Sequence, residues 1–234
     1  RDMGAAEVCP DAISYSAGIS ACEKGCEWHA AMSILQLMRA GSAVPNTLSY
    51  SGAISACEKG SGDLWALALF LAESCVPDVV SQSAIISASE KAARWSLALA
   101  LLSEMPELAI LANLVSLNAA LSACDRRCRW QAASDLFHAI PMRRLRADLL
   151  SCNSAMSACA AGQPQNAWPL FLATEGLGIS PDIVTYTCLQ TACGALQRSE
   201  VLPQIFEAME RFQAQLFRNA FLRSKETSME KSLK

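Results

Sequence analysis

The sequence lacks the features by which membrane proteins and most enzymes are recognised. Its longest apolar run, Leu64–Ala72, is far shorter than the ~20 apolar residues that a membrane-spanning helix needs. It contains no glycine-rich phosphate loop, no nucleophile elbow and no paired catalytic carboxylates. We therefore expect no membrane association, no catalysis, no small-molecule substrate and no cofactor.

Positive charge and aromatic residues are also scarce. The chain has 19 Lys and Arg against 22 Asp and Glu, a net charge of -3 at pH 7, and only 6% aromatic residues. A chain with this balance has no overall attraction for a polyanion such as nucleic acid. Both features favour a protein partner.

An internal repeat is what the sequence does have. The string SYSAGISACEKGCEW at residues 14–28 returns, with increasing changes, from residues 49, 81, 116, 151 and 185. Successive copies therefore start 35, 32, 35, 35 and 34 residues apart, and a fixed period of this size is the signature of a repeat protein. Since 52% of the residues are hydrophobic, we expect one elongated array in which each repeat packs on its neighbours.

Each repeat predicts two helices. In the first helix, Tyr15, Ile19 and Cys22 recur at helical spacing and form an apolar face, with a polar stripe one residue further along. The second helix opens with Trp-x-x-Ala, at Trp28, Trp65, Trp95 and Trp130. The second repeat has fewer residues after its tryptophan, so its second helix should be short. The predicted fold class is all-α, a right-handed α-solenoid of stacked helix-turn-helix repeats.

The repeats end at residues suited to capping the next helix, namely Asn46, Asp78, Asn113, Asp148 and Asp182. The predicted division is residues 1–11 for the end of a preceding repeat, 12–46, 47–78 (irregular), 79–113, 114–148 and 149–182 for repeats 1 to 5, 183–217 for a partial repeat 6, and 218–234 for the end of a capping helix and a tail. Because the chain opens inside a repeat, we expect it to be a piece of a longer protein, and any targeting peptide of that protein to lie outside this piece.

The cysteines are interpreted as packing residues. One repeat position holds Cys22, Cys57, Cys124, Cys159 and Cys193, with Ser89 in their place in the third repeat. A position that accepts cysteine or serine once per repeat is a small buried site, and residues one repeat apart are too distant to form disulfides. A reducing compartment fits these free thiols best.

Two short groups are faintly similar to metal ligands: Cys22, Cys26 and His29, and the pair Cys124 and Cys128. Zinc sites need a second ligand pair at short range, and neither group has one. We therefore predict no metal site.

These features together resemble the pentatricopeptide repeat family. The period of about 35 residues, the helix pair, the tyrosine followed by a polar residue and the Pro-Asp junction in PDIVTYTCL (residues 181–189) all carry the resemblance, which covers about residues 1–217. Tetratricopeptide repeats have a period of about 34 residues, but their Trp-Leu-Gly-Tyr pattern is missing. The deaminase-like domain of some family members, with its His-x-Glu and Cys-x-x-Cys ligands, has no match here.

The resemblance implies binding of single-stranded RNA, with one base recognised by each repeat. In that family a base is selected by the fifth residue of a repeat together with its last residue. The corresponding pairs are Ser16 with Asn46, Ser51 with Asp78, Ser83 with Asn113, Asn118 with Asp148, and Asn153 with Asp182. The family's code then implies the sequence 5′-AGAUU-3′. Thr187 would begin a sixth pair with Phe217, to which we assign no base.

Two further groups of residues are candidates for contact with RNA. The second residue of each repeat is aliphatic, and in the family it clamps the base: Ile13, Leu48, Val80, Val115 and Leu150. A basic residue ends four of the first helices and is predicted to contact phosphate: Lys24, Lys59, Lys91 and Arg126.

Alternatives remain for each group. The polar stripe is also what a solvated helix face looks like, and the aliphatic residues equally suit packing between repeats. Each basic residue follows an acidic one, such as Glu23, so local ion pairs can neutralise it. The expected function is RNA processing, stability or translation in a mitochondrion or chloroplast, as the resemblance implies. A protein-binding α-solenoid scaffold is the alternative.

Overall fold

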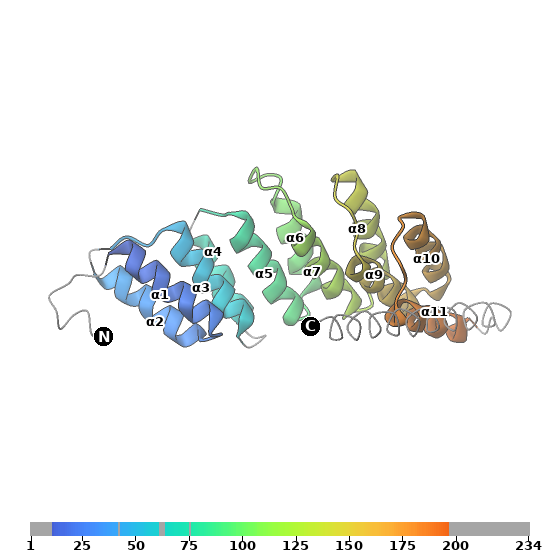
Figure 1. Ribbon diagram of the computed structural model, residues 1–234, viewed down its shortest axis with the longest axis horizontal. Helices are drawn as coiled ribbons and strands as arrows, with labels where there is room; N and C mark the ends of the chain where they lie inside the picture. The colour runs from blue at the N-terminus through green and yellow to red at the C-terminus, as the bar shows by residue number, and fades with distance from the viewer. Residues whose placement is uncertain (1–10, 42, 61–63, 75, 197–234) are drawn as a thin grey trace, which may run out of the picture. The chain divides into compact units, whose positions relative to one another are not determined.

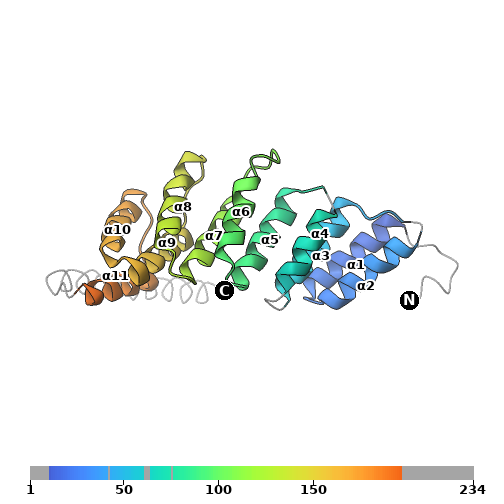
Figure 2. The ribbon, with the colours of Figure 1, turned by 180° about the vertical axis from the view of Figure 1, so that it is seen from behind.

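The computed structural model describes residues 11–41, 43–60, 64–74 and 76–196, and within them it contains helices and no strand (Figures 1 and 2). The helices are α1 (Ala12–Lys24), α2 (Trp28–Ala40), α3 (Thr47–Lys59), α4 (Trp65–Glu73), α5 (Val79–Lys91), α6 (Trp95–Glu104), α7 (Leu114–Asp125), α8 (Trp130–Met142), α9 (Leu149–Gly162), the 3-10 helix η3 (Pro164–Asn166), α10 (Ala167–Gly176) and α11 (Ile183–Ala195). In this part of the chain, none of the helices has the length and hydropathy that crossing a bilayer requires.

The helices form hairpins that stack in order along the chain. The chain divides into two compact units, the first made of Arg1–Arg127 with His138–Arg146 and the second of Cys128–Phe137 with Ala147–Lys234. In the first unit, α1, α3 and α5 each contact the next first helix and also their own second helix. In the second unit, α9 contacts both α10 and α11. The predicted all-α class of stacked helix-turn-helix repeats is confirmed.

Every first helix begins directly after a capping side chain. The carboxylate or amide oxygen of the preceding residue accepts a hydrogen bond from the third backbone N–H of the helix, with distances between 2.7 Å at Asp78 and 2.9 Å at Asn46. The capping residues are Asp11, Asn46, Asp78, Asn113, Asp148 and Asp182. Each such cap stabilises a helix start by about 1 kcal/mol, so the expected capping role of the repeat-ending residues is confirmed.

The second helices begin where the sequence predicts. The Trp-x-x-Ala alanines Ala31, Ala68, Ala98 and Ala133 have no exposed surface. The tryptophans themselves are only half-buried. Helix α4 has 9 residues against 13 in α2, which confirms the expected shortening.

Neighbouring repeats meet closely where a glycine of one faces the tryptophan of the previous one. A Cβ atom added to Gly162 would lie 2.4 Å from Trp130 Cδ1, and one added to Gly60 would lie 2.8 Å from Trp28 Cδ1. Trp65 of repeat 2 contacts repeat 3 in another way, since the Arg94 guanidinium lies 4.3 Å from the centre of its ring. The tryptophans therefore join adjacent repeats.

This contact predicts opposite effects for two Gly-to-Ala substitutions. We expect Gly162→Ala to lower the free energy of unfolding by about 1–3 kcal/mol, because the new methyl overlaps a ring atom that cannot move without shifting Trp130. The control is Gly194→Ala in α11, where an added Cβ meets no neighbouring atom within 4 Å. This substitution should raise the free energy of unfolding by about 0.5–1 kcal/mol, because alanine favours the helix more than glycine does. Urea unfolding of both variants measures the difference. Equal stabilities would contradict the close contact.

The repeated cysteine position is a packing site, as expected. Cys57, Cys124, Cys159 and Cys193 are buried, and Cys22 in the first described repeat is half-buried. Burial raises the pKa of Cys57 and Cys124 to about 11, so these thiols stay protonated at neutral pH. All the cysteines in the described ranges are free thiols. The predicted repeat end at residues 1–11 (apart from Asp11), the last part of repeat 6 and the tail at residues 218–234 lie outside the described residues.

Candidate functional site

A hollow in the first unit lies on the polar faces of three consecutive first helices. It has a volume of about 360 Å³ and is open to solvent. Its lining comes from α1 (Ser20, Glu23), α3 (Thr47, Leu48, Ser51, Gly52, Ser55) and the start of α5 (Asp78, Val80). It thus brings together both residues of one predicted base-selecting pair, Ser51 and Asp78, and both aliphatic residues predicted to clamp the same base.

The predicted base-selecting residues at the fifth position are more buried than a solvated stripe would be. Ser16 is 3% exposed and Ser51 is 5% exposed, and the Oγ of each donates a hydrogen bond to a backbone carbonyl four residues earlier. Because that bond uses the only hydroxyl proton, each serine oxygen is left to accept hydrogen bonds. Ser83 and Asn118 are also buried.

Three of the predicted pairs make side-chain contacts. The distance to the Oδ1 of the last residue is 3.5 Å from Ser16 to Asn46 and 3.5 Å from Ser83 to Asn113. The Nδ2 of Asn153 donates to Asp182 Oδ1 at 3.1 Å. Of the other two pairs, Ser51 and Asp78 share the hollow described above, and Asn118 and Asp148 belong to different compact units.

The Asp182 carboxylate is held in its charged form. Burial raises its pKa, but hydrogen bonds from Thr185 and Asn153 outweigh burial and bring the pKa below its usual value. At neutral pH this carboxylate therefore only accepts hydrogen bonds.

The predicted clamping residues are exposed although they are aliphatic. Their exposed fractions are 77% for Ile13, 60% for Leu48, 57% for Val80, 60% for Val115 and 57% for Leu150. Side chains that packed between repeats would be buried, so packing is not what these residues do. A row of exposed aliphatic side chains at one repeat position is an available apolar surface.

The basic residues at the ends of the first helices form ion pairs between repeats. Lys59 pairs with Glu23 at 2.8 Å, Lys91 with Glu58 at 2.9 Å, and Arg126 with Glu90 at 3.1 Å. The ion-pair partner is thus the carboxylate of the previous repeat, not the adjacent acidic residue that the sequence suggested. The hydrogen bond to Glu23 raises the pKa of Lys59.

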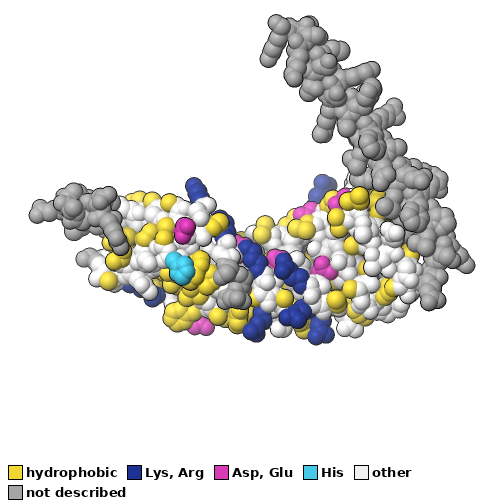
Figure 3. Space-filling model, turned by 90° about the horizontal axis from the view of Figure 1, so that it is seen from below, with side chains coloured by type: hydrophobic (Ala, Val, Ile, Leu, Met, Phe, Trp, Pro, Cys, Tyr) yellow, Lys and Arg dark blue, Asp and Glu magenta, His cyan; other side chains and the backbone are white. Residues whose placement is uncertain are grey.

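These pairs affect the predicted phosphate contacts. A phosphate that binds Lys59, Lys91 or Arg126 has to compete with a carboxylate already in place, and exposed ion pairs of this kind contribute about 0–1 kcal/mol each. Lys24 is exposed and makes no ion pair with any residue that the structure describes. The side of the molecule seen in Figure 3 carries Lys and Arg side chains with Asp and Glu among them, so the charge on that side is mixed.

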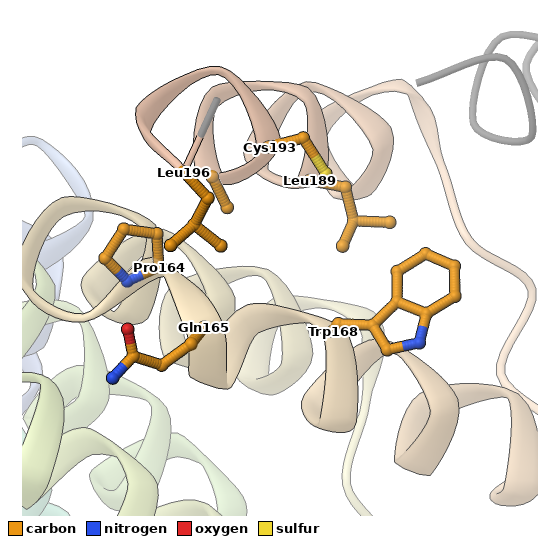
Figure 4. Close-up of a pocket in the computed structure, with 7 residues that line it drawn as sticks. Pro164, Gln165, Trp168, Leu189, Cys193 and Leu196 are labelled. Atoms are coloured by element: carbon orange, nitrogen blue, oxygen red, sulfur yellow. The ribbon is translucent and has the colours of Figure 1, made fainter. Parts of the chain in front are cut away.

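A smaller, largely apolar pocket of about 80 Å³ lies in the second unit. It is lined by residues of η3, the start of α10 and the end of α11, among them Pro164, Trp168, Leu189 and Cys193 (Figure 4). None of the predicted RNA-binding residues reaches it. Among the described residues, no group of three or more His, Cys, Asp and Glu side chains has the arrangement of a metal site.

The third position of the repeat, which the sequence analysis missed, holds a buried hydroxyl in repeats 2 to 6. These residues are Ser49, Ser81, Ser116, Ser151 and Thr185, and all are at most 1% exposed. Ser49 Oγ lies 2.9 Å from Ser16 Oγ and 2.8 Å from Asn46 Oδ1, and so contacts both members of a predicted pair. The signal was present in the sequence, since a hydroxyl residue stands at this position in every copy of the repeat.

No known protein-family profile matches the sequence, and no curated protein matches it. Several solved structures do match the fold. The pentatricopeptide repeat protein PPR10, in complex with an 18-nt psaJ RNA element, is 19% identical with a TM-score of 0.76, over 91% of this chain and 31% of that chain. PPR10 from maize is 22% identical with a TM-score of 0.67, over 89% of this chain and 30% of that chain. The chain has the pentatricopeptide repeat fold.

A third match concerns a pentatricopeptide repeat domain by itself. The PPR domain of Arabidopsis thaliana protein-only RNase P 1, in complex with tRNA, is 10% identical with a TM-score of 0.51, over 83% of this chain and 86% of that domain. The chain described here thus spans less than a third of the PPR10 chains and most of this domain. The predicted resemblance to the family is confirmed at the level of the fold.

Proposed function

We propose that the chain is a pentatricopeptide repeat protein that binds single-stranded RNA and recognises one base with each repeat. The hollow between repeats 2 and 3 carries the proposal, because it places Ser51, Asp78, Leu48 and Val80 around one open space. Polar groups at the base edge and apolar groups at the base faces are what recognition of an unstacked base requires. The matched fold of PPR10, which was solved with bound RNA, supports the same function.

The geometry of the caps supports a chemical basis for base choice. In each repeat-ending Asn or Asp, one side-chain oxygen is occupied by the backbone N–H that it caps. An asparagine is then left with its NH₂ group, which only donates, whereas an aspartate is left with a second oxygen, which only accepts. The Watson–Crick ring nitrogen is an acceptor in adenine and cytosine and a donor in guanine and uracil. Asn46 and Asn113 therefore suit A or C, and Asp78 and Asp182 suit G or U.

This division agrees with the sequence 5′-AGAUU-3′ that the family's code implies. Asn153, whose amide donates to Asp182, adds a second hydrogen-bonding group at the base of repeat 5. The role that follows from the resemblance is RNA processing, stability or translation in a mitochondrion or chloroplast, with no catalysis by this chain.

A direct titration tests the proposal. The chain should bind a short single strand that contains AGAUU more tightly than a strand with the same bases scrambled, at near-physiological salt, because phosphate contacts alone do not distinguish the two. Fluorescence anisotropy with labelled strands gives both affinities, and the exposed-face variant Gln131→Ala should behave like the natural chain. Equal affinities would contradict base recognition.

A protein-binding scaffold is the alternative function. It is favoured by the ion pairs, because Glu23, Glu58 and Glu90 place carboxylates on the surface that RNA would occupy. In the same titration, an absence of binding to every strand would favour this alternative.

A further inference from the structure

The hydroxyl of Thr185 contacts both predicted base-selecting residues of the preceding repeat. Its Oγ1 lies 2.6 Å from Asn153 Oδ1 and 2.9 Å from Asp182 Oδ1. The same hydroxyl oxygen accepts a hydrogen bond from the backbone N–H of Asp182 at 3.1 Å. The backbone N–H of Thr185 donates to Asp182 Oδ1 at 2.9 Å. Thr185 has no exposed surface, so water does not compete for these bonds.

This arrangement fixes the orientation of the Asn153 amide. Two oxygens 2.6 Å apart need a proton between them, and only the Thr185 hydroxyl can supply it, because Asn153 Oδ1 carries none. The amide NH₂ then points at the Asp182 carboxylate, which accepts from it at 3.1 Å. The reverse orientation would place two acceptor oxygens against each other, Asn153 Oδ1 and Asp182 Oδ1.

The same arrangement occurs in repeat 1, but not in repeat 2. Ser49 Oγ lies within hydrogen-bond distance of both Ser16 and Asn46. By contrast, Ser81 Oγ bonds only the backbone N–H and C=O of Asp78, and Ser51 bonds the carbonyls of its own helix. Ser81 therefore has the same capping role without a contact to the fifth-position residue.

We propose that Thr185, and by the same geometry Ser49, is a positioning residue that holds the base-selecting pair of the preceding repeat in the orientation that recognises its base. The proposal rests on the proposed RNA-binding function. In repeat 5 the fixed orientation leaves the second N–H of Asn153 and the second oxygen of Asp182 available to the base. Uracil offers the matching acceptor and donor, whereas cytosine presents a donor and an acceptor in the opposite places.

The test is the preference of repeat 5 for U over C at the fifth base of the AGAUU strand. In Thr185→Val, which keeps the shape and removes the hydroxyl, we expect this preference to fall about threefold to tenfold, the effect of about one hydrogen bond. Thr185→Ser should restore the preference. Ser81→Ala, which removes a capping hydroxyl that touches no fifth-position residue, should leave the preference of repeat 2 for G unchanged.

Each result for the Thr185 variants either supports the positioning role or contradicts it. If Thr185→Val loses stability but keeps the full preference for U, Thr185 is only a capping residue and the proposal is wrong. If the natural chain shows no preference for U, the proposed function fails in repeat 5. The positioning role is then tested alone by the side-chain amide NMR signals of Asn153. These signals should shift and exchange faster with water in Thr185→Val than in Thr185→Ser, and identical signals would overturn the inference.

Discussion

Replacing Asp182 with asparagine is expected to change the base that repeat 5 prefers from U to C. The amide oxygen of the new asparagine can still cap α11, as Asn46 and Asn113 cap α3 and α7. Its remaining group becomes an NH₂ donor in place of an oxygen acceptor, and the donor matches the ring nitrogen of cytosine. The ratio of affinities for strands ending in AGAUU and AGAUC should change by about 10- to 100-fold, as one well-placed hydrogen-bonding contact does.

The reverse substitution is the matched control. Asn46→Asp should move repeat 1 from A toward G and leave the fifth base unaffected, because the two pairs are separated by three repeats. Stability should change little in both variants, since Asn and Asp are equally good N-caps. If Asp182→Asn weakened all strands equally, the carboxylate would be acting through charge and not through base recognition.

The helices and their caps could be predicted from the sequence because both are local. A cap such as Asp182 needs only the backbone three residues away, and a face such as Tyr15, Ile19 and Cys22 needs only the helical period. Both kinds of feature recur in every repeat, so the repetition itself singles them out.

The contacts between repeats could not be predicted in the same way. Lys59 follows Glu58 in the sequence, yet it pairs with Glu23 of the previous repeat, since adjacent residues on a helix do not face each other. Which residues meet across two repeats depends on how the repeats pack, as Gly60 does against Trp28. The position of Thr185 between Asn153 and Asp182 depends on that packing too. The sequence therefore indicated the base-selecting pairs but not what holds them.

The largest effect on affinity, independent of base identity, is expected from removing the two aliphatic side chains of the hollow. Leu48 and Val80 come from consecutive first helices and line the same space as Ser51 and Asp78. A base in that space would bury both its faces against them, and contacts of this kind contribute about 1–3 kcal/mol per base when the partner is aromatic.

The double substitution Leu48→Ala with Val80→Ala should therefore weaken binding to the AGAUU strand about tenfold or more, while the preference for G over A at the second base stays. Stability should hardly change, because the two side chains are 60% and 57% exposed. The matched control is Val44→Ala with Val76→Ala, two valines that are 79% and 74% exposed but do not line the hollow. Anisotropy titrations of both double variants measure the difference. Equal affinities would mean that the exposed aliphatic row does not contact RNA, and a protein partner would then be the better explanation for it.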